Sequence, residues 1–163
     1  DMNKCVFLDR DGTINVDKGY LYLPSDLDFI SGVPKALKMI KNKGFMLIVV
    51  SNQSGINRGK YTVNDVEIFH NEMNKQLIAR GSTAIDAFYI CPHFNQNCDC
   101  RKPLPGMIIS AAKDYNIDLT LSYMIGDKET DVLAGQNAGL KKSYRVDANH
   151  SLLFYAKLIC RWL

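Results

Sequence analysis

The sequence predicts an α/β fold, in which a doubly wound parallel sheet is covered by helices on both faces. Short, uninterrupted apolar runs, typical of strands buried on both sides, alternate with segments of helical periodicity. Crossovers between parallel strands are right-handed, which places helices on both faces of such a Rossmann-like sheet. A hydrophobic share of 47% in 163 residues supports a single domain, and we expect it to span residues 1–163.

The first half of the chain predicts two strands and two helices. Cys5–Leu8 and residues 45–50 are continuous apolar runs and are expected to be buried strands. Val33–Asn42 has apolar residues at helical spacing, and residues 62–80 form a longer helical pattern with Thr62 as its N-cap. Each strand is thus followed by a helix, as a parallel sheet requires.

The second half of the chain continues this alternation. Strands are expected at three further runs, at residues 87–90, 123–125 and 143–146. Helices are expected at residues 106–115, Glu129–Ala138 and 151–162. The connections at 15–30 and 91–105 are too long for simple turns, and long loops in compact domains are usually functional.

The charge and the cysteines limit the kinds of partner. The formal net charge of +3 suits an anionic substrate but is too weak to indicate nucleic acid or a membrane surface. No apolar run approaches the length of a membrane span. Three of the five cysteines lie close together beside a histidine, which favours a metal site in a reducing cytosol over disulfides.

Polar side chains follow three of the expected strands directly. Asp9 and Asp11 come after the first strand, Ser51 after the second and Asp127 after the fourth. Ligands of such sheets bind at the carboxyl ends of the strands, so we expect these side chains to converge on one edge. Three carboxylates, a hydroxyl and a nearby lysine describe a site for a phosphate and a divalent metal.

The paired aspartates allow a division of labour. Asp9 and Asp11 are two residues apart and point the same way in an extended segment. One carboxylate can attack while the other moves a proton, and with Asp127 they form an oxygen set that suits Mg²⁺. Each motif alone is common in solvated turns and helix caps. Their joint occurrence after buried strands favours a phosphate site.

These residues resemble the motifs of the haloacid dehalogenase-like (HAD-like) phosphatases. Asp9-Arg10-Asp11-Gly12-Thr13 is similar to the first motif of that family, Ser51 to its second and Gly126-Asp127 to its last. The resemblance implies that Asp9 forms an aspartyl-phosphate, that Asp11 is the general acid and base, and that Ser51 holds the phosphoryl group. It also implies that Mg²⁺ is held by the Asp9 carboxylate, the Asp11 backbone carbonyl and the Asp127 carboxylate.

Many phosphatases of that family carry a cap domain over the site. In this chain the segments between the first three strands hold only loops and one helix each. We therefore expect a HAD core with no separate cap domain, covered by the loops at 15–30, 54–61 and 91–105.

One group within this family, the heptose-1,7-bisphosphate 7-phosphatases, resembles the chain more closely, from about Lys4 to Gly139. The matching segments are residues 51–56, 58–59, 91–93, 98–103, 105–107 and 126–128. The resemblance implies a cytoplasmic bacterial hydrolase that removes the 7-phosphate of D-glycero-D-manno-heptose 1,7-bisphosphate with Mg²⁺, in the synthesis of lipopolysaccharide precursors. Little is implied for the segment after Gly139.

The same resemblance implies substrate-binding residues. Lys102 would stabilise the phosphoryl group, and Arg101 and Lys128 would contact the substrate. Two further loops would line the sugar pocket with Asp17, Lys18, Gly19, Tyr20, Asn52, Gln53 and Ser54. On size alone we expect a monomer, with a small phosphorylated sugar as its partner and neither nucleic acid nor a membrane.

The long connection at 91–105 contains a possible zinc site. Cys91, His93, Cys98 and Cys100 offer three thiolates and one imidazole, a full tetrahedral set for structural Zn²⁺. Such a metal would fix where the adjoining Arg101 and Lys102 point. Free thiols beside an unligated histidine are the alternative, and the stretch between His93 and Cys98 is shorter than is typical of the family.

Other functions stay open at this point. A histidinol-phosphate phosphatase would share the motifs, although those enzymes tend to have Asp in place of Ser54 and Arg in place of Lys128. A phosphatase of nucleic-acid ends would need a basic groove with aromatic residues. A catalytically silent phosphate-binding module would have no reason to keep both Asp9 and Asp11. A phosphoryl transferase usually needs a cap that excludes water. The preferred sugar anomer is also open.

Overall fold

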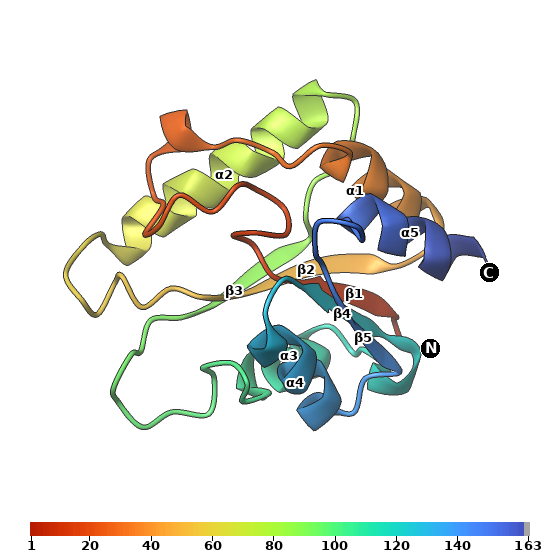
Figure 1. The fold of residues 1–163 in the computed structure, drawn as a ribbon. Coiled ribbons are helices and arrows are strands. Elements are labelled where there is room, and N and C mark those ends of the chain that lie inside the picture. Colours follow the sequence, from red (N-terminus) through yellow and green to blue (C-terminus); the bar gives the residue numbers. More distant parts are fainter. Residues whose placement is uncertain (162–163) are drawn as a thin grey trace.

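The computed structural model describes residues 1–161 and shows a five-stranded parallel sheet (Figure 1). The strand order is β3-β2-β1-β4-β5, so the first strand of the chain lies at the centre. The strands are β1 (Cys5–Leu8), β2 (Met46–Asn52), β3 (Ala87–Cys91), β4 (Tyr123–Gly126) and β5 (Lys142–Arg145). The expected parallel α/β sheet is confirmed.

Helices cover both faces of this sheet. In Figure 1, α1, α2 and α5 lie above it and α3 and α4 lie below it. The helices are α1 (Val33–Asn42), α2 (Val63–Ala79), α3 (Gly106–Asp114), α4 (Glu129–Ala138) and α5 (Leu152–Arg161), with short 3-10 turns η1 (Pro24–Asp26) and η2 (Leu119–Leu121). The chain is therefore doubly wound.

The central strand shows how the sequence produces two cores. Successive side chains of a strand point to opposite faces. Val6 and Leu8 belong to the core beneath α1, α2 and α5, whereas Cys5 and Phe7 belong to the core against α3 and α4. Because both faces of β1 are buried, an uninterrupted apolar run is required here, as the sequence shows.

Most boundaries of the expected elements agree with the structure within one or two residues. The second strand extends past the apolar run through Ser51 and Asn52, because both residues pair with β3. Thr62 caps α2 as expected, in a capping box with Asp65. The expected last helix ends at Trp162, which lies outside the described residues.

Within residues 1–161, no separate cap domain stands over the sheet. The chain between β1 and β2 holds a loop, η1 and α1, and the chain between β2 and β3 holds one turn and α2. The structure thus agrees with the expected capless core. None of the helices described is both long and apolar enough to cross a membrane.

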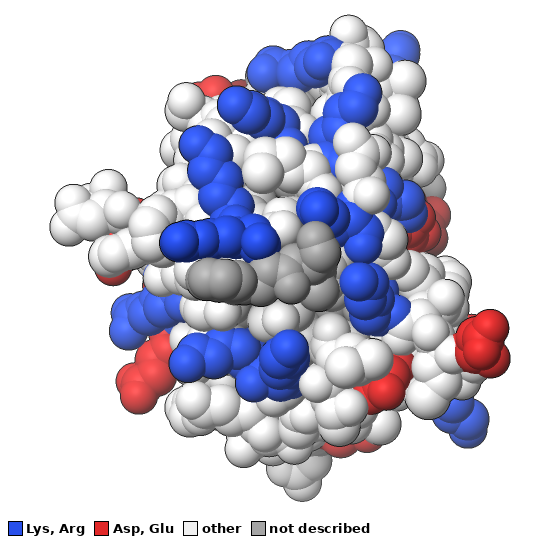
Figure 2. All heavy atoms as spheres, turned by 90° about the vertical axis from the view of Figure 1, so that its right-hand side faces the viewer, with Lys and Arg blue, Asp and Glu red and all other residues white. Residues whose placement is uncertain are grey.

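Positive side chains gather away from the carboxyl ends of the strands. Figure 2 shows Lys and Arg spread over the face where both chain ends lie. Lys4 precedes β1, Lys43 precedes β2, and Lys141 and Lys142 stand at the start of β5. These four lysines thus stand at the end of the sheet opposite to the acidic strand ends.

Candidate active site

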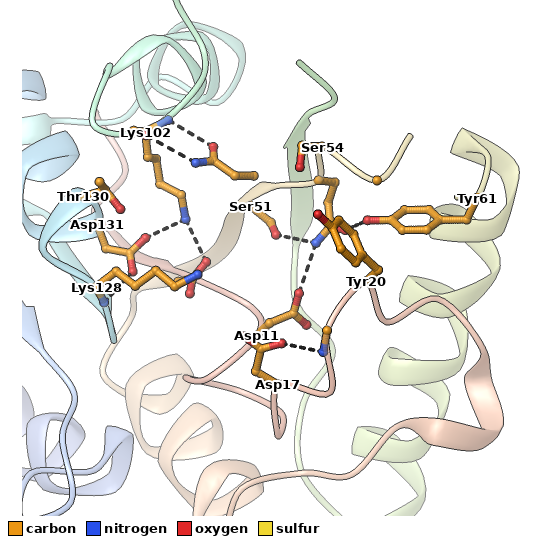
Figure 3. Close-up of a pocket in the computed structure, with 15 residues that line it drawn as sticks. Asp11, Asp17, Tyr20, Ser51, Ser54, Tyr61, Lys102, Lys128, Thr130 and Asp131 are labelled. Atoms are coloured by element: carbon orange, nitrogen blue, oxygen red, sulfur yellow. Dashed lines mark hydrogen bonds and ion pairs between the residues drawn. The ribbon is translucent and has the colours of Figure 1, made fainter. Parts of the chain in front are cut away.

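A pocket of about 220 Å³ lies at the carboxyl ends of the strands, where the sequence predicts a site. Figure 3 shows side chains from several separate segments pointing toward this space. Most of the expected residues line it: Asp9, Asp11, Asp17, Gly19, Tyr20, Ser51, Asn52, Gln53, Ser54, Lys102 and Lys128. Residues far apart in the sequence thus meet at one edge of the sheet, as a parallel α/β fold predicts.

Two of the expected substrate residues do not line this pocket. The Lys18 ammonium donates a hydrogen bond to the Asp26 carbonyl at 2.8 Å. The Arg101 guanidinium donates to the His93 carbonyl at 2.6 Å, within its own loop. Both side chains would have to rotate before they could contact a ligand in the pocket.

The turn after β1 brings the carboxylates close together. The backbone N–H of Asp9 donates to the Ile125 carbonyl of β4 at 3.0 Å. Gly12 has a φ of 86°, and a Cβ atom at this position would lie 2.2 Å from Oδ2 of Asp127. Only glycine therefore permits the first motif to approach the last one so closely.

Three carboxylates form a cluster at these strand ends. Asp9, Asp127 and Asp131 each present an oxygen within 4.8 Å of the others. Burial and the neighbouring Asp9 raise the pKa of Asp127 to about 7. Oδ1 of Asp127 is buried and has no hydrogen-bond partner among the described residues. Carboxylate oxygens that lie this close repel one another, and one of them has no partner. A hard divalent cation such as Mg²⁺ would bind such oxygens.

Asp131 differs from Asp127 because both of its oxygens are engaged. Its Oδ1 forms an ion pair with the Lys102 ammonium at 2.6 Å, and its Oδ2 accepts the backbone N–H of Lys128 at 3.0 Å. Its side chain therefore holds Lys102 and the start of α4 in place. Asp127, with its unpartnered oxygen, is the better candidate for a metal ligand.

Lys102 bridges the cluster from the long loop before α3. Its buried ammonium lies 2.7 Å from Oδ1 of Asp9 and 2.8 Å from the Val50 carbonyl oxygen. Burial lowers the pKa of Lys102, but Asp9 and Asp131 outweigh burial and hold it above the ordinary value. Asn52 fixes the backbone of Lys102 with two hydrogen bonds, one to its carbonyl and one from its N–H. A permanent cation thus lies against Asp9.

Asp11 points away from the carboxylate cluster. Its Oδ1 accepts from Arg10 at 2.9 Å and from Asn15 at 3.0 Å, and its Oδ2 accepts from Arg10 at 3.1 Å and from Gln53 at 3.3 Å. Burial raises the pKa of Asp11, but the Arg10 charge and these hydrogen bonds outweigh burial and lower it. Asp11 is therefore ionised in the free protein.

Arg10 is a fully buried cation that supports this aspartate. Its guanidinium also donates to the Leu21 carbonyl at 3.0 Å and lies 3.2 Å from Nε2 of His70. Burial and the Arg10 charge lower the pKa of His70 to about 3, so its ring is neutral and can accept from Arg10. The sequence pattern alone gave Arg10 no role.

The cysteines and the histidine of the long loop meet as expected. One ligand atom from each of Cys91, His93, Cys98 and Cys100 lies within 4.8 Å of the others. Nδ1 of His93 is 3.3 Å from Sγ of Cys91 and 3.3 Å from Sγ of Cys100. The Arg101 backbone N–H lowers the pKa of Cys98 to about 7. This set has the chemistry of a tetrahedral zinc site, and Sγ of Cys91 and Sγ of Cys100, 2.6 Å apart, would have to separate to hold the ion.

Without a bound cation, the stability of the protein should fall as the pH rises through about 7. The pKa of Asp127 is raised from 3.8 to about 7 in the folded state. The folded protein therefore keeps a proton that the unfolded chain loses, and this stabilisation is complete below the unfolded pKa and lost through the folded one. The unfolding temperature of chelator-treated protein should decrease between about pH 5 and about pH 8.

Two variants check the source of this pH dependence. Asp127→Asn removes the titrating group and should flatten the decrease. Asp28→Asn, at an exposed loop position, makes the same chemical change and should leave it intact. An equal decrease of the unfolding temperature with pH in the wild type and both variants would contradict the assignment of this effect to Asp127.

Four pocket residues were not predicted from the sequence. They are Gly55, Tyr61, Thr130 and Asp131. Asp131 stands four residues after Asp127, in the same strand-to-helix junction, so its spacing was an available signal. The position of Tyr61 depends on how the 54–61 turn folds back on β2, and no short motif carries that information.

Comparison with known proteins agrees with this geometry. Residues 99–143 match the family model described as HAD-hydrolase-like. A D-glycero-β-D-manno-heptose-1,7-bisphosphate 7-phosphatase from Helicobacter pylori is 46% identical over 142 residues, covering 86% of this chain and 82% of the relative. The protein with the same name from Escherichia coli K12 is 47% identical over 146 residues, covering 83% and 76%.

A solved structure is similar over nearly its whole length. The D,D-heptose 1,7-bisphosphate phosphatase from B. bronchiseptica, complexed with magnesium and phosphate, matches with a TM-score of 0.87 at 27% identity. The match covers 98% of this chain and 99% of that chain.

Proposed function

The chain belongs to the family of D-glycero-β-D-manno-heptose-1,7-bisphosphate 7-phosphatases, and we propose that it removes the 7-phosphate of that sugar bisphosphate. The observation that carries the proposal is Asp9, held against the buried Lys102 ammonium at the floor of a pocket. The same pocket contains an ionised second aspartate and a serine hydroxyl. Such a set serves transfer of a phosphoryl group to a carboxylate and then to water.

Asp9 is the nucleophile in this proposal. An oxygen of its carboxylate attacks phosphorus, the bond from phosphorus to the sugar 7-oxygen breaks, and an aspartyl-phosphate forms. The Lys102 ammonium, 2.7 Å from Oδ1 of Asp9, places a positive charge beside the reacting group. A water molecule then attacks the aspartyl-phosphate, which releases inorganic phosphate and restores Asp9.

Asp11 is the general acid of the first step and the general base of the second in this proposal. The leaving 7-oxygen takes a proton from Asp11, and the attacking water later returns one to it. Since Asp11 is ionised in the free protein, the first proton has to arrive with the substrate. A phosphate monoester, with a second pKa of about 6, can bring that proton.

Magnesium fits the acidic cluster. The Asp9 and Asp127 carboxylates and the Asp11 backbone carbonyl would hold it. When bound, it would supply positive charge that neutralises the transferring phosphoryl group. The unpartnered oxygen of Asp127 supports this assignment.

The rim of the pocket selects the sugar in this proposal. Asp17, Gly19, Tyr20 and Ser54 line the pocket from two loops, and Lys128 lines it from the start of α4. Thr130 lines the same pocket, and we include it among the proposed substrate-binding residues.

We also propose that the chain is a single phosphatase domain that acts as a monomer in the cytoplasm. Its free cysteines support a reducing compartment.

Zinc is proposed for the set of Cys91, His93, Cys98 and Cys100, and its loss should weaken substrate binding. The expected content is one zinc per chain, measured by elemental analysis of protein purified without chelator. Cys98→Ser should lower zinc retention and raise KM before the core unfolds, because Arg101 and Lys102 follow the site directly. Cys160→Ser, on α5, is the matched control and should retain zinc. Zinc-free wild-type protein would refute the four-ligand site.

Phosphate release with Mg²⁺ tests the proposed substrate. The compounds compared are both anomers of the heptose 1,7-bisphosphate, histidinol phosphate and p-nitrophenyl phosphate. We expect a strong preference for one heptose anomer. A preference for histidinol phosphate would contradict the proposed heptose substrate but would agree with the proposed phosphatase mechanism. Absence of turnover with every compound would leave a binding module as the better description.

A further inference from the structure

Every polar group of Gln53 is already engaged within the protein. Its backbone N–H donates to the Cys91 carbonyl at 2.8 Å, and its backbone carbonyl accepts from Ile56 at 3.2 Å. Its side-chain Nε2 donates to Oγ of Ser51 at 2.8 Å and to Oδ2 of Asp11 at 3.3 Å. The residue is only 2% exposed. Gln53 therefore has no free donor for a sugar, although it lines the pocket.

The remaining polar atom of Gln53, Oε1, accepts a hydrogen bond from the Tyr61 hydroxyl. Figure 3 shows this contact and the two dashed lines that continue to Ser51 and Asp11. Tyr61 comes from the turn before α2, so a residue outside the phosphatase motifs is connected to two residues inside them.

Tyr61 is itself held in place by two neighbours. Its ring stacks on Tyr22 with centroids 5.3 Å apart and an interplanar angle of 18°. A Cβ atom at Gly55 would lie 2.2 Å from Cε2 of the ring, so glycine is needed there for the close approach. The hydroxyl is thereby aimed at one place, Oε1 of Gln53.

This contact, together with those to Ser51 and Asp11, fixes which way the Gln53 amide faces. An amide has a donor end and an acceptor end of nearly the same shape. With Oε1 bound to Tyr61, the NH₂ group must face Ser51 and Asp11. Because Oγ of Ser51 then accepts from Gln53, its own hydrogen is free to be donated into the pocket. In the flipped orientation, Oε1 would face Oδ2 of Asp11, an oxygen that already accepts from Arg10, and would compete for the Ser51 hydrogen.

We propose that Tyr61 is a positioning residue for the reaction, which fixes the Gln53 amide so that Ser51 donates to the phosphoryl group and Asp11 keeps its orientation. The inference rests on the proposed phosphatase function and extends it beyond the motif residues. It assigns Gln53 to positioning as well, in place of the direct sugar contact expected from the sequence.

The test removes only the Tyr61 hydroxyl. In Tyr61→Phe the ring and its stacking stay, whereas the amide loses the contact that orients it. With p-nitrophenyl phosphate and Mg²⁺, we expect kcat to fall about tenfold and KM to change little, because the affected groups act on the phosphoryl group. Tyr22→Phe is the matched control. Its hydroxyl makes no hydrogen bond among residues 1–161, and kcat should stay unchanged.

A double-mutant cycle shows whether Tyr61 acts through Gln53. In a Gln53→Ala background, Tyr61→Phe should have no further effect on kcat. An equal tenfold loss in both backgrounds would overturn the proposal. So would a Tyr61→Phe variant with a lower unfolding temperature and unchanged kcat, since that result describes a structural hydrogen bond.

Two further outcomes keep the inference separate from the proposed function. If Tyr61→Phe does not fold, Gly55→Ala shifts the Tyr61 ring and should lower kcat in the same direction. Unchanged kcat in this variant would also overturn the proposal. If the wild-type protein releases no phosphate from any of the compounds above, the proposed function fails, whereas a fully active Tyr61→Phe variant refutes the positioning role alone.

Discussion

Asp9→Asn is expected to reduce phosphate release by more than about 10⁴-fold, because an amide cannot form the aspartyl-phosphate. The loss should appear in kcat for every phosphate monoester tested, since the nucleophile is common to all of them. Asp11→Asn should lose less, about 10²- to 10⁴-fold, as is typical for removal of general acid–base help. The order of these two losses separates the nucleophile from the proton carrier.

The fold should survive the Asp9→Asn substitution. Lys102 keeps its ion pair with Asp131 at 2.6 Å and its hydrogen bond to the Val50 carbonyl. Removal of the Asp9 charge also relieves repulsion within the carboxylate cluster, so the pKa of Asp127 should return toward its ordinary value. An unfolding temperature at or above that of the wild type is therefore expected, together with the loss of turnover.

Asp28→Asn is a suitable control for both measurements, because it makes the same change at an exposed position in a loop. It should leave kcat and the unfolding temperature as they are. Substantial phosphate release by Asp9→Asn, with the control active, would show that another group attacks phosphorus. Loss of folding would place Asp9 in the scaffold as well as in the chemistry.

The strands and the catalytic edge could be predicted from the sequence because they depend on local patterns. A continuous apolar run such as Cys5–Leu8 requires burial on both faces, and that requirement already implies a parallel sheet. The residue that follows such a run lies at the catalytic edge whatever the details of packing. This reasoning placed Asp9 and Asp127 correctly after their strands, whereas Ser51, expected after the second strand, lies within the end of β2 at the same edge.

The directions of individual side chains could not be predicted in this way. Asp9 and Asp11 were expected to point the same way, yet Asp9 faces Lys102 while Asp11 faces Arg10 and Gln53. A bend at Arg10, between the two aspartates, breaks the extended geometry on which the expectation rested. The partners of Asp11 come from its own loop and from Gln53, 42 residues away, and the second contact is visible only in the folded chain.

The site also depends on a loop that the sequence places far from the nucleophile. Lys102 and Asp9 are 93 residues apart, and Asn52 and the Cys/His set hold the loop that joins them. Neither the first motif nor the loop forms the site alone. The charge of Lys102 is the link between them, which makes its removal the most informative change outside the nucleophile.

Lys102→Met should damage both stability and activity. The Lys102 side chain is 3% exposed, and its ammonium pairs with Asp9 and Asp131, whose side chains are 9% and 2% exposed. Methionine keeps the length of the side chain but leaves three clustered carboxylates without a cation. Breaking a buried pair in this way costs about 3–5 kcal/mol. Activity should fall about 10²- to 10³-fold, as on removal of one group that stabilises the developing charge.

The pH dependence of this variant should identify the cause. Without Lys102, the charge that lowers the pKa of Asp131 is gone, so burial and the Asp9 charge raise that pKa further above the unfolded value and Asp131 binds its proton more firmly. Stability that depends on that proton is present at low pH and lost as the pH rises. The difference in unfolding temperature between the wild type and Lys102→Met should therefore be smaller near about pH 5 than near about pH 8.

Lys113→Met is the matched control, because Lys113 is exposed in the last turn of α3. It removes the same charge from the chain and should change neither kcat nor the pH profile of unfolding. A Lys102→Met protein that is equally destabilised at every pH would point to lost packing. A Lys102→Met protein that is as stable as the wild type at every pH but inactive would show that Lys102 acts on the phosphoryl group and does not offset the charge of the buried carboxylates.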